Sequence, residues 1–330
     1  MTSLRPPPPN VLVENVNVNS NSSENFNTVF DVKCEIGRGR FAKVCKVVKK
    51  NNQSAIAAAK IIRRFRNGMD TYSAILQEIE ILQKSKGHPF IVDIIDYYVT
   101  NRDVSVILEY SSGGDLYRHV FDQSAPLSEA DTRVVMTQLL QALKFIHAQS
   151  IVHLDIKPEN ILIKSTDPCY KISLCDFGVA KYLDKNTIIR NLVGTPDYAA
   201  PEILNFNPIH LTTDIWSTGV VAYFLLTSVS PFWSETKEKT YSNVTSLRII
   251  YDDELFEGIT ESALDFIKRS IVLHPDSRPS SSDLLHDPWI KNCNINERSD
   301  LPTPCVSQSP SSTSIASTKT DLPERIIHVS

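Results

Sequence analysis

The chain has 330 residues, of which 42% are hydrophobic and 22% are charged, with a formal net charge of −4 at pH 7. Because a single hydrophobic core stops growing at roughly 250–300 residues, two lobes with flanking segments are expected. The net charge argues against general binding to nucleic acid or anionic membranes. The longest apolar run, 219–226, is far shorter than the ~20 residues of a membrane-spanning helix, and no apolar secretory segment begins the sequence.

Cysteine spacing indicates a reducing compartment. The sequence contains neither a CxxC pair nor a metal-ligand spacing among its six cysteines: Cys34, Cys45, Cys169, Cys175, Cys293 and Cys305. We expect free thiols and therefore a cytoplasmic or nuclear protein. Composition does not fix an oligomeric state.

Two polar segments flank the remainder of the chain. Residues 1–27 are rich in Pro, Asn and Ser, and residues 293–330 in Ser, Thr and Pro. Neither has the apolar side chains needed for a core, so both are predicted to be disordered. A folded domain is expected between them, with the boundaries 28–292 for the domain, 28–110 for an N-terminal lobe, 109–115 for a hinge and 115–292 for a C-terminal lobe.

The N-terminal lobe is predicted to be mainly β. Strands are expected over 29–36, 43–48, 55–62, 91–98 and 104–110, and a helix over 71–83. Gly37 and Gly39 lie in the first turn, where backbone N–H groups could approach phosphate oxygens, although an unrelated tight turn would look the same. Lys60 lies in an apolar strand and needs an anion if it is buried, unless it reaches solvent at the strand edge. Glu78, beside the apolar stripe of the helix, is the candidate anion.

A basic segment, 63–70, separates the third strand from the helix. Its sequence begins Arg-Arg-Phe-Arg. Two interpretations are open, a solvated loop or a docking surface.

The most informative stretch is 153–160, with the sequence HLDIKPEN. Apolar pairs and triplets on either side, 151–152 and 161–163, predict two buried strands joined by a polar loop. A loop anchored in this way is a common place for catalytic groups, although an ordinary strand connection would have the same pattern. The candidate groups are Asp155, Lys157 and Asn160.

The C-terminal lobe is predicted to be mainly helical. Helices are expected over 115–121, 128–148, 214–227, 237–244, 260–271 and 280–286. Ser128 with Asp131 and Thr213 are the expected N-terminal caps of two of them. Asp176 follows a strand over 170–174 and precedes Phe-Gly, a turn suited to a metal ligand. Loop 179–199 is long enough to be functional or mobile.

In this order the elements resemble the eukaryotic protein kinase family over about residues 30–292. The resemblance implies an α+β fold with a small, mainly β N-lobe that holds one key helix and a larger, mainly α C-lobe. It implies ATP and Mg²⁺ as cofactors and proteins as substrates.

The family roles carry over position by position. Asp155 would be the catalytic base, Lys157 would neutralise the γ-phosphoryl group, and Lys60 would bind the α- and β-phosphates. The implied Mg²⁺ ligands are Asn160 and Asp176. The other implied nucleotide-binding positions are Ile36, Gly37, Arg38, Gly39, Val44, Ala58, Glu78, Glu109, Tyr110, Asp115 and Leu162. Implied structural positions are Leu108 as gatekeeper, the pair Glu202 and Arg278, and Asp214 beneath the catalytic loop.

A narrower resemblance concerns the death-associated protein kinase family. It rests on the basic residues 63–66, His-Leu-Asp at 153–155 and the sequence GTPDYAAPE at 194–202. A kinase domain followed by a short polar tail is similar to the DAP-kinase-related apoptosis-inducing branch. The resemblance implies Ser/Thr specificity, autophosphorylation, apoptosis signalling and myosin regulatory light chain as a candidate substrate. Calmodulin binding is not predicted, because residues 293–330 do not form a basic amphipathic helix.

Two positions depart from the family pattern. Ala42 replaces the third loop glycine and is small enough to preserve phosphate contact. Leu154 replaces the arginine that normally grips a phosphorylated activation loop, so we expect activity without a loop phosphate. Asp115 and Glu159 are expected to favour substrates with basic residues near position −3.

The main alternative is a pseudokinase scaffold that binds nucleotide and partners without phosphotransfer. The complete set Lys60, Asp155, Asn160 and Asp176 favours an enzyme. A small-molecule kinase of related fold is the second alternative, and the segment 200–202 with Arg278 favours protein substrates instead.

Overall fold

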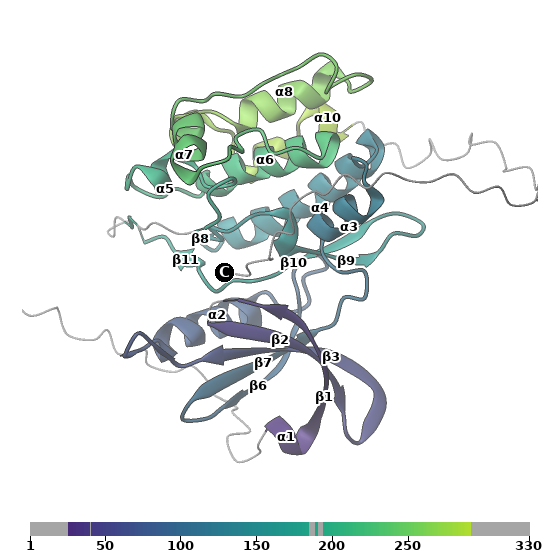
Figure 1. The fold of residues 1–330 in the computed structure, drawn as a ribbon, viewed down its shortest axis with the longest axis vertical. Helices are drawn as coiled ribbons and strands as arrows, with labels where there is room; N and C mark the ends of the chain where they lie inside the picture. Colours follow the sequence, from purple (N-terminus) through teal and green to yellow (C-terminus); the bar gives the residue numbers. More distant parts are fainter. Residues whose placement is uncertain (1–25, 40, 185–188, 191–193, 292–330) are drawn as a thin grey trace, which may run out of the picture.

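The protein was analysed as a computed structural model, which describes residues 26–39, 41–184, 189–190 and 194–291. Two lobes lie one above the other in Figure 1: a β-sheet with one long helix below, and a helical lobe above. The α+β, two-lobed architecture predicted from the sequence is confirmed. The predicted polar tails lie outside the described residues, apart from Phe26 and Asn27.

The N-lobe is built on one antiparallel sheet with the strand order β1-β2-β3-β7-β6. Its strands are β1 Phe30–Arg38, β2 Ala42–Lys49, β3 Asn52–Arg63, β6 Ile94–Val99 and β7 Asp103–Glu109. Helix α2 (Tyr72–Lys84) buries the predicted apolar stripe, which consists of Ile75, Ile79 and Leu82. Glu78 is buried in the same helix with 4% of its surface exposed, so it faces inward, as the sequence suggested.

The folded domain begins before the expected boundary at residue 28. Helix α1 (Phe26–Val29) precedes β1, and Phe26 has only 6% of its surface exposed. Its ring stacks on Phe30 with 5.9 Å between centroids and lies against Tyr98 at 6.1 Å. The aromatic contact orders two residues that composition alone assigned to the tail.

The basic segment is a hairpin and not an irregular loop. Strands β4 (Phe65–Arg66) and β5 (Met69–Asp70) pair across a turn in which Gly68 has a φ of +80°. Arg64 holds Asp70 through two hydrogen-bonding nitrogens, at 2.6 and 2.9 Å. The local ion pair fixes a segment whose composition alone suggested only solvated charge.

The C-lobe contains helices on every side of one buried helix, α6. Its helices are α3 Leu116–Gln123, α4 Glu129–His147, α5 Pro201–Leu204, α6 Thr213–Thr227, α7 Lys237–Thr245, α8 Glu261–Ser270, α9 Ser281–Leu284 and α10 Pro288–Lys291. Every residue of α6 is buried, which explains why its sequence is apolar nearly all round. Helices α4 and α8 pack against it.

Three details of these helices differ from the prediction. Thr212 and not Thr213 is the N-cap of α6, because the Thr213 hydroxyl instead accepts a hydrogen bond from His210 N–H at 3.0 Å. The helix expected over 280–286 ends at Leu284. Pro288 opens a separate helix, since a missing N–H is harmless in the first turn.

Two short sheets carry the central polar loop. The loop leaves β8 (Ile151–Val152) and enters β9 (Ile161–Ser165) through a short 3₁₀ turn, Pro158–Asn160. The two buried strands expected from the sequence are present, but each pairs with a different partner. The partners are β11 (Lys181–Tyr182) for β8 and β10 (Lys171–Leu174) for β9.

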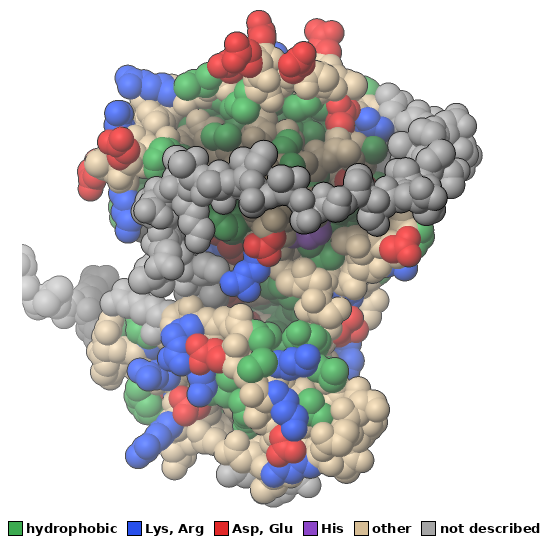
Figure 2. All heavy atoms as spheres, turned by 45° about the vertical axis from the view of Figure 1, so that its right-hand side comes forward, with side chains coloured by type: hydrophobic (Ala, Val, Ile, Leu, Met, Phe, Trp, Pro, Cys, Tyr) green, Lys and Arg blue, Asp and Glu red, His purple; other side chains and the backbone are tan. Residues whose placement is uncertain are grey.

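Charges of both signs cover the surface in Figure 2. Lys and Arg side chains are spread over the N-lobe, whereas Asp and Glu side chains gather at the far end of the C-lobe. Across the described residues, no helix combines the length and apolar character needed to cross a bilayer.

Candidate active site

Three charged side chains meet where the lobes join. Lys60 Nζ on β3 lies 2.7 Å from Glu78 Oε1 on α2 and 2.7 Å from Asp176 Oδ1, which follows β10. The three come from separate segments, and Lys60 and Asp176 are 116 residues apart in sequence. The predicted Lys60–Glu78 pair is therefore present, and Asp176 joins it.

Mutual charge compensation explains why these groups tolerate burial. Burial by itself would lower the pKa of Lys60, but the negative charges of Asp176 and Glu78 outweigh it and raise that pKa well above its usual value. Burial likewise disfavours ionised Asp176, yet the adjacent Lys60 charge and hydrogen bond keep the pKa of this carboxyl lowered. The lysine is thus a fixed cation at the junction of the lobes.

The polar loop places a carboxylate, a cation and a hydroxyl in contact. Asp155 Oδ2 lies 2.9 Å from Lys157 Nζ and accepts a hydrogen bond from Asn160 Nδ2 at 2.9 Å. Thr195 Oγ1 donates to Asp155 Oδ1 at 3.2 Å and accepts from Lys157 Nζ at 2.8 Å. Asp155 and Lys157 have 5% and 3% of their surfaces exposed, so the pair is held in one geometry.

Asp214 of α6 holds the backbone of this loop from the C-lobe side. Its carboxylate accepts the backbone N–H of His153 at 2.8 Å and of Leu154 at 2.9 Å. Leu154 has a φ of +68°, a strained conformation for a residue with a branched side chain. His147 on α4 contacts the same carboxylate at 2.9 Å and so links the brace to the helical core.

Two oxygen atoms remain available for a metal ion. Asp176 uses Oδ1 for Lys60 and Gly178 N–H, and Asn160 uses Nδ2 for Asp155. In the described part of the chain, no hydrogen bond engages Asp176 Oδ2 or Asn160 Oδ1. Neutral and anionic oxygens are the ligands Mg²⁺ prefers, usually completed by water and phosphate oxygens, so these residues fit the implied ion.

The glycine turn closes the tip of the β1–β2 hairpin. Gly39 N–H donates to Ala42 C=O at 2.8 Å, and Gly37 pairs with Val44 across the strands. Arg38 holds Glu35 in an exposed ion pair, with its Nε 2.7 Å from Glu35 Oε1. Arg38, which was predicted to bind nucleotide, is the last residue of β1, pairs with Lys43 and directs its guanidinium to Glu35 of the same strand.

The remaining predicted nucleotide positions lie on both sides of the lobe junction. Ala58 pairs with Leu108 across β3 and β7, and Val44 pairs with Lys60 across β2 and β3. Ile36 lies near the end of β1 and is 44% exposed. On the C-lobe side are Leu162 of β9 and Asp115, which form an isolated β-bridge.

The hinge connects the lobes through a backbone that is only partly hydrogen-bonded. Glu109 N–H donates to Asp93 C=O at 2.9 Å, and Glu109 pairs with Ala57 at the end of the β3–β7 ladder. Tyr110 lies under the ammonium of Lys46, 4.8 Å from the ring centroid. Ser111, which sequence reasoning missed, has a buried hydroxyl without a hydrogen-bond partner among the described residues. It is the second residue after β7, within the hinge segment expected from the sequence.

Two further predicted positions bear on what the site can bind. Asp115 caps α3 by accepting Arg118 N–H at 2.8 Å, and burial raises the pKa of its carboxyl. Burial also raises the pKa of Glu159, whose buried Oε2 has no hydrogen-bond partner within the described ranges.

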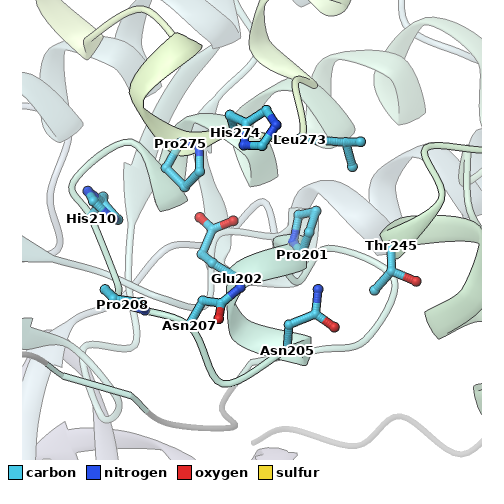
Figure 3. A pocket seen from close by; sticks show the side chains of 10 residues that line it. All are labelled: Pro201, Glu202, Asn205, Asn207, Pro208, His210, Thr245, Leu273, His274 and Pro275. Atoms are coloured by element: carbon cyan, nitrogen blue, oxygen red, sulfur yellow. The ribbon is translucent and has the colours of Figure 1, made fainter.

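A separate hollow of about 380 Å³ lies in the C-lobe, away from these groups. Figure 3 shows Glu202 at its centre, with His210, His274 and Pro275 on one side and Asn205 and Thr245 on the other. Glu202 is already paired with Arg278 at 2.7 and 2.8 Å, as the sequence predicted. The hollow therefore surrounds a structural ion pair.

Comparison with known proteins agrees with this geometry. A family model for the protein kinase domain matches residues 30–290. Serine/threonine-protein kinase 17A of Oryctolagus cuniculus is 36% identical over 264 residues, which cover 80% of this chain and 66% of that protein. A death-associated protein kinase related protein of Drosophila melanogaster is 36% identical over 279 residues, covering 84% of this chain and 41% of that protein.

The third relative is the death-associated protein kinase dapk-1 of Caenorhabditis elegans, 35% identical over 270 residues, which cover 81% of this chain and 19% of that protein. The chain thus spans 66%, 41% and 19% of the lengths of these relatives. The names of the Drosophila and Caenorhabditis relatives confirm the resemblance to death-associated protein kinases that residues 63–66, 153–155 and 194–202 indicated, and the name of the Oryctolagus relative confirms the Ser/Thr specificity. With a matching family model and the expected charged groups assembled between two lobes, the chain belongs to the protein kinase domain family.

Proposed function

We propose that this protein is a serine/threonine protein kinase that transfers the γ-phosphoryl group of ATP to hydroxyl groups of protein substrates. The observation that carries the proposal is the double contact of Lys60, 2.7 Å from both Glu78 and Asp176. It joins the N-lobe helix, the N-lobe sheet and the C-lobe in one arrangement. A scaffold that only binds partners would not need it.

Each side chain has a task that follows from its contacts. ATP with Mg²⁺, when bound, supplies the phosphoryl group and metal charge that neutralises its oxygens. Lys60 orients the phosphates, and Asn160 and Asp176 present oxygens to the metal. Asp155 orients the substrate hydroxyl and accepts its proton, while Lys157 stabilises negative charge on the group in transfer.

The deciding experiment is transfer of labelled phosphate from Mg·ATP to an arginine-containing serine peptide. Wild-type protein should label the peptide, and Asp155→Ala and Lys60→Ala should not. Asp122→Ala, an exposed position on α3, is the matched control and should retain wild-type activity. Absence of transfer by the wild type would favour the scaffold alternative instead.

We further propose that substrates carry a basic residue near position −3. The support is Glu159, a largely buried carboxylate whose Oε2 has no hydrogen-bond partner among the described residues. Burial raises the pKa of Glu159 because its surroundings disfavour the ionised carboxylate. An arginine side chain of a substrate would pair with that carboxylate and offset the cost of burying its charge. Asp115 contributes a second negative charge nearby. Peptides that vary one position at a time would reveal a preference for acidic residues or proline if the proposal is wrong.

We also propose that catalysis does not require a phosphorylated activation loop. Leu154 is apolar and 6% exposed, so it offers no guanidinium to a phosphate. If phosphatase treatment abolished activity, and a phosphosite within 179–199 accounted for the loss, this proposal would fail.

The wider biological role is proposed from similarity to death-associated protein kinases. We propose a function in apoptosis-related signalling, with autophosphorylation and with myosin regulatory light chain as a candidate substrate. Four free cysteines in the described residues, Cys34, Cys45, Cys169 and Cys175, support a reducing compartment such as cytoplasm or nucleus. Phosphorylation of purified light chain tests the substrate directly.

A further inference from the structure

One stripe of helix α2 carries polar side chains that the proposed chemistry does not use. Gln77, Glu80 and Lys84 lie at i, i+3 and i+7, which places them on one face of the helix. Gln77 immediately precedes Glu78, the residue that must stay beside Lys60. Any contact that holds this stripe therefore also fixes the position of Glu78.

The stripe contacts the segment that follows Asp176. Gln77 Nε2 donates to the carbonyl of Ala180 at 2.7 Å. One and two turns further along the helix, the Tyr182 hydroxyl donates to Glu80 Oε1 at 3.1 Å and accepts from Lys84 Nζ at 3.1 Å. Glu80 and Lys84 also pair directly at 2.7 Å, and the Lys84 ammonium lies 4.9 Å from the Tyr182 ring centroid.

The backbone of Tyr182 belongs to the other lobe. Strand β11 pairs with β8, with Tyr182 opposite Ile151 and Lys181 opposite Val152. Strand β8 continues directly into the loop that holds Asp155. Leu183 N–H donates to Ser150 C=O at 2.7 Å and extends the same connection. One residue thus contacts the N-lobe helix with its side chain and the catalytic loop with its strand.

The Tyr182 hydroxyl is well suited to this double contact. Burial raises its pKa above the usual value, so it keeps its proton at neutral pH and can donate to the Glu80 carboxylate. Hydrogen bonds to charged groups are stronger than neutral ones. The order Glu80 then Lys84 along the helix is also the favourable order for an i, i+4 pair.

We infer that Tyr182, with Gln77, is a positioning residue that latches helix α2 to β11 and so keeps Glu78 beside Lys60 without an activation-loop phosphate. The inference rests on the proposed kinase function. It goes further by naming the contact that holds helix α2 in place, a task that an activation-loop phosphate would otherwise perform. Leu154 removes the usual phosphate receptor, and the latch provides a contact between the same lobes made entirely of unmodified side chains.

The test removes single polar groups and keeps the packing. Tyr182→Phe retains the ring and loses both hydrogen bonds, and Gln77→Leu retains the length and loses the donor. In phosphatase-treated protein we expect each change to lower kcat by about threefold to tenfold, because the net loss of one ordinary, partly exposed hydrogen bond shifts the helix equilibrium by about that factor. Hydrogen exchange of backbone amides 75–82 should accelerate in parallel, while the melting temperature stays within about 2 °C of the wild type.

Matched controls separate the latch from general damage. Tyr241→Phe on α7 removes a hydroxyl with no hydrogen bond in the described residues, and Gln83→Leu changes an exposed position of the same helix. Neither should change kcat or the exchange of residues 75–82. The double variant Tyr182→Phe with Gln77→Leu should lose less than the product of the single losses, since both act through one helix movement.

Unchanged exchange in residues 75–82 of the Tyr182→Phe variant would overturn the inference, even if its activity fell. Wild-type kcat in that variant would also overturn it. The exchange measurement needs no catalysis. A wild-type protein that transferred no phosphate would therefore refute the proposed function and leave the latch testable on its own.

Discussion

The protein contains two buried ion-pair centres, and they are built differently. In the C-lobe, Arg278 holds Glu202 with two nitrogens and donates its other hydrogens to the carbonyls of Val272, Thr212 and Leu273. At the lobe junction, Lys60 serves two carboxylates, and Asp176 keeps one oxygen without a hydrogen bond among the described residues. In the first centre the protein itself accepts every guanidinium hydrogen, whereas in the second a carboxylate oxygen is left for a bound group.

This contrast separates stability from activity. A saturated buried pair contributes when both partners are present and becomes costly when one is removed. An unsaturated pair is maintained at a cost in stability and is completed by a bound group. Substitution at the first centre should therefore lower mainly stability, and substitution around the second should lower mainly activity. The following changes are expected to show this difference.

The largest effect on activity is expected at Asp155, in the polar loop between β8 and β9. Asp155→Ala should lower kcat by about 10²–10⁴, the usual contribution of a general base, which corresponds to about 3–5 kcal/mol of activation free energy. Asp155→Ala also takes the carboxylate away from the buried Lys157 ammonium, so the free energy of unfolding should fall as well, while the protein stays folded. Steady-state phosphotransfer and urea unfolding measure the two quantities. Turnover like that of the wild type would contradict the assignment.

The second effect is expected at the saturated centre. Arg278→Met leaves Glu202 buried without its partner and should lower the free energy of unfolding by about 3–5 kcal/mol. Urea denaturation followed by tryptophan fluorescence measures this, since Arg278 lies 5.2 Å from the Trp216 ring centroid. Arg38→Met, at an exposed ion pair, is the control and should leave the free energy of unfolding nearly unchanged. Equal losses in the two variants would remove the distinction between the centres.

A smaller effect is expected at Glu159, where substitution should lower activity and raise stability. Glu159→Gln should lower kcat/KM for an arginine-containing peptide by roughly tenfold, about the value of one charge-assisted contact. The same change should slightly increase the free energy of unfolding, because it removes a largely buried charge whose Oε2 has no hydrogen-bond partner among the described residues. A peptide with alanine in place of arginine should be phosphorylated equally by both proteins. A loss of stability in the variant would contradict this interpretation.

The smallest expected effect is a pH dependence from the same residue. Burial raises the pKa of Glu159 in the folded protein, so its proton is held more tightly than in the unfolded chain. Its contribution to stability is therefore largest below the unfolded pKa of about 4.3 and declines as pH rises through the folded value. Discrimination between arginine and alanine peptides should fall as pH is lowered toward that value. Glu159→Gln should weaken this pH dependence and leave only the part that Asp115 contributes.

The sequence predicted the junction of the lobes because each of its groups has a local signature. A lysine in an apolar strand demands an anion, and Glu78 beside a buried helical stripe is a candidate with few rivals. The polar loop at 153–160 was recognisable because apolar strands enclose it. These predictions concern single elements, so they needed no knowledge of distant contacts.

Other features depend on contacts between distant segments and could not be predicted. Thr195 bridges Asp155 and Lys157 from a separation of 38 to 40 residues. The ring of Phe26 is held by packing against the rings of Phe30 and Tyr98. The hydrogen bonds of Tyr182 to helix α2 likewise span about a hundred residues, with a separation of 102 for Glu80. The composition of these segments does not encode such encounters.

The way Asp214 holds the loop has an evolutionary consequence. It grips the backbone N–H groups of His153 and Leu154, so the unusual φ of +68° at position 154 does not depend on which side chain stands there. Side-chain identity at this position can therefore drift without remodelling the catalytic loop. Many leucine and arginine codons differ by a single base. A lineage carrying this architecture could thus acquire or discard phosphate control by one nucleotide change.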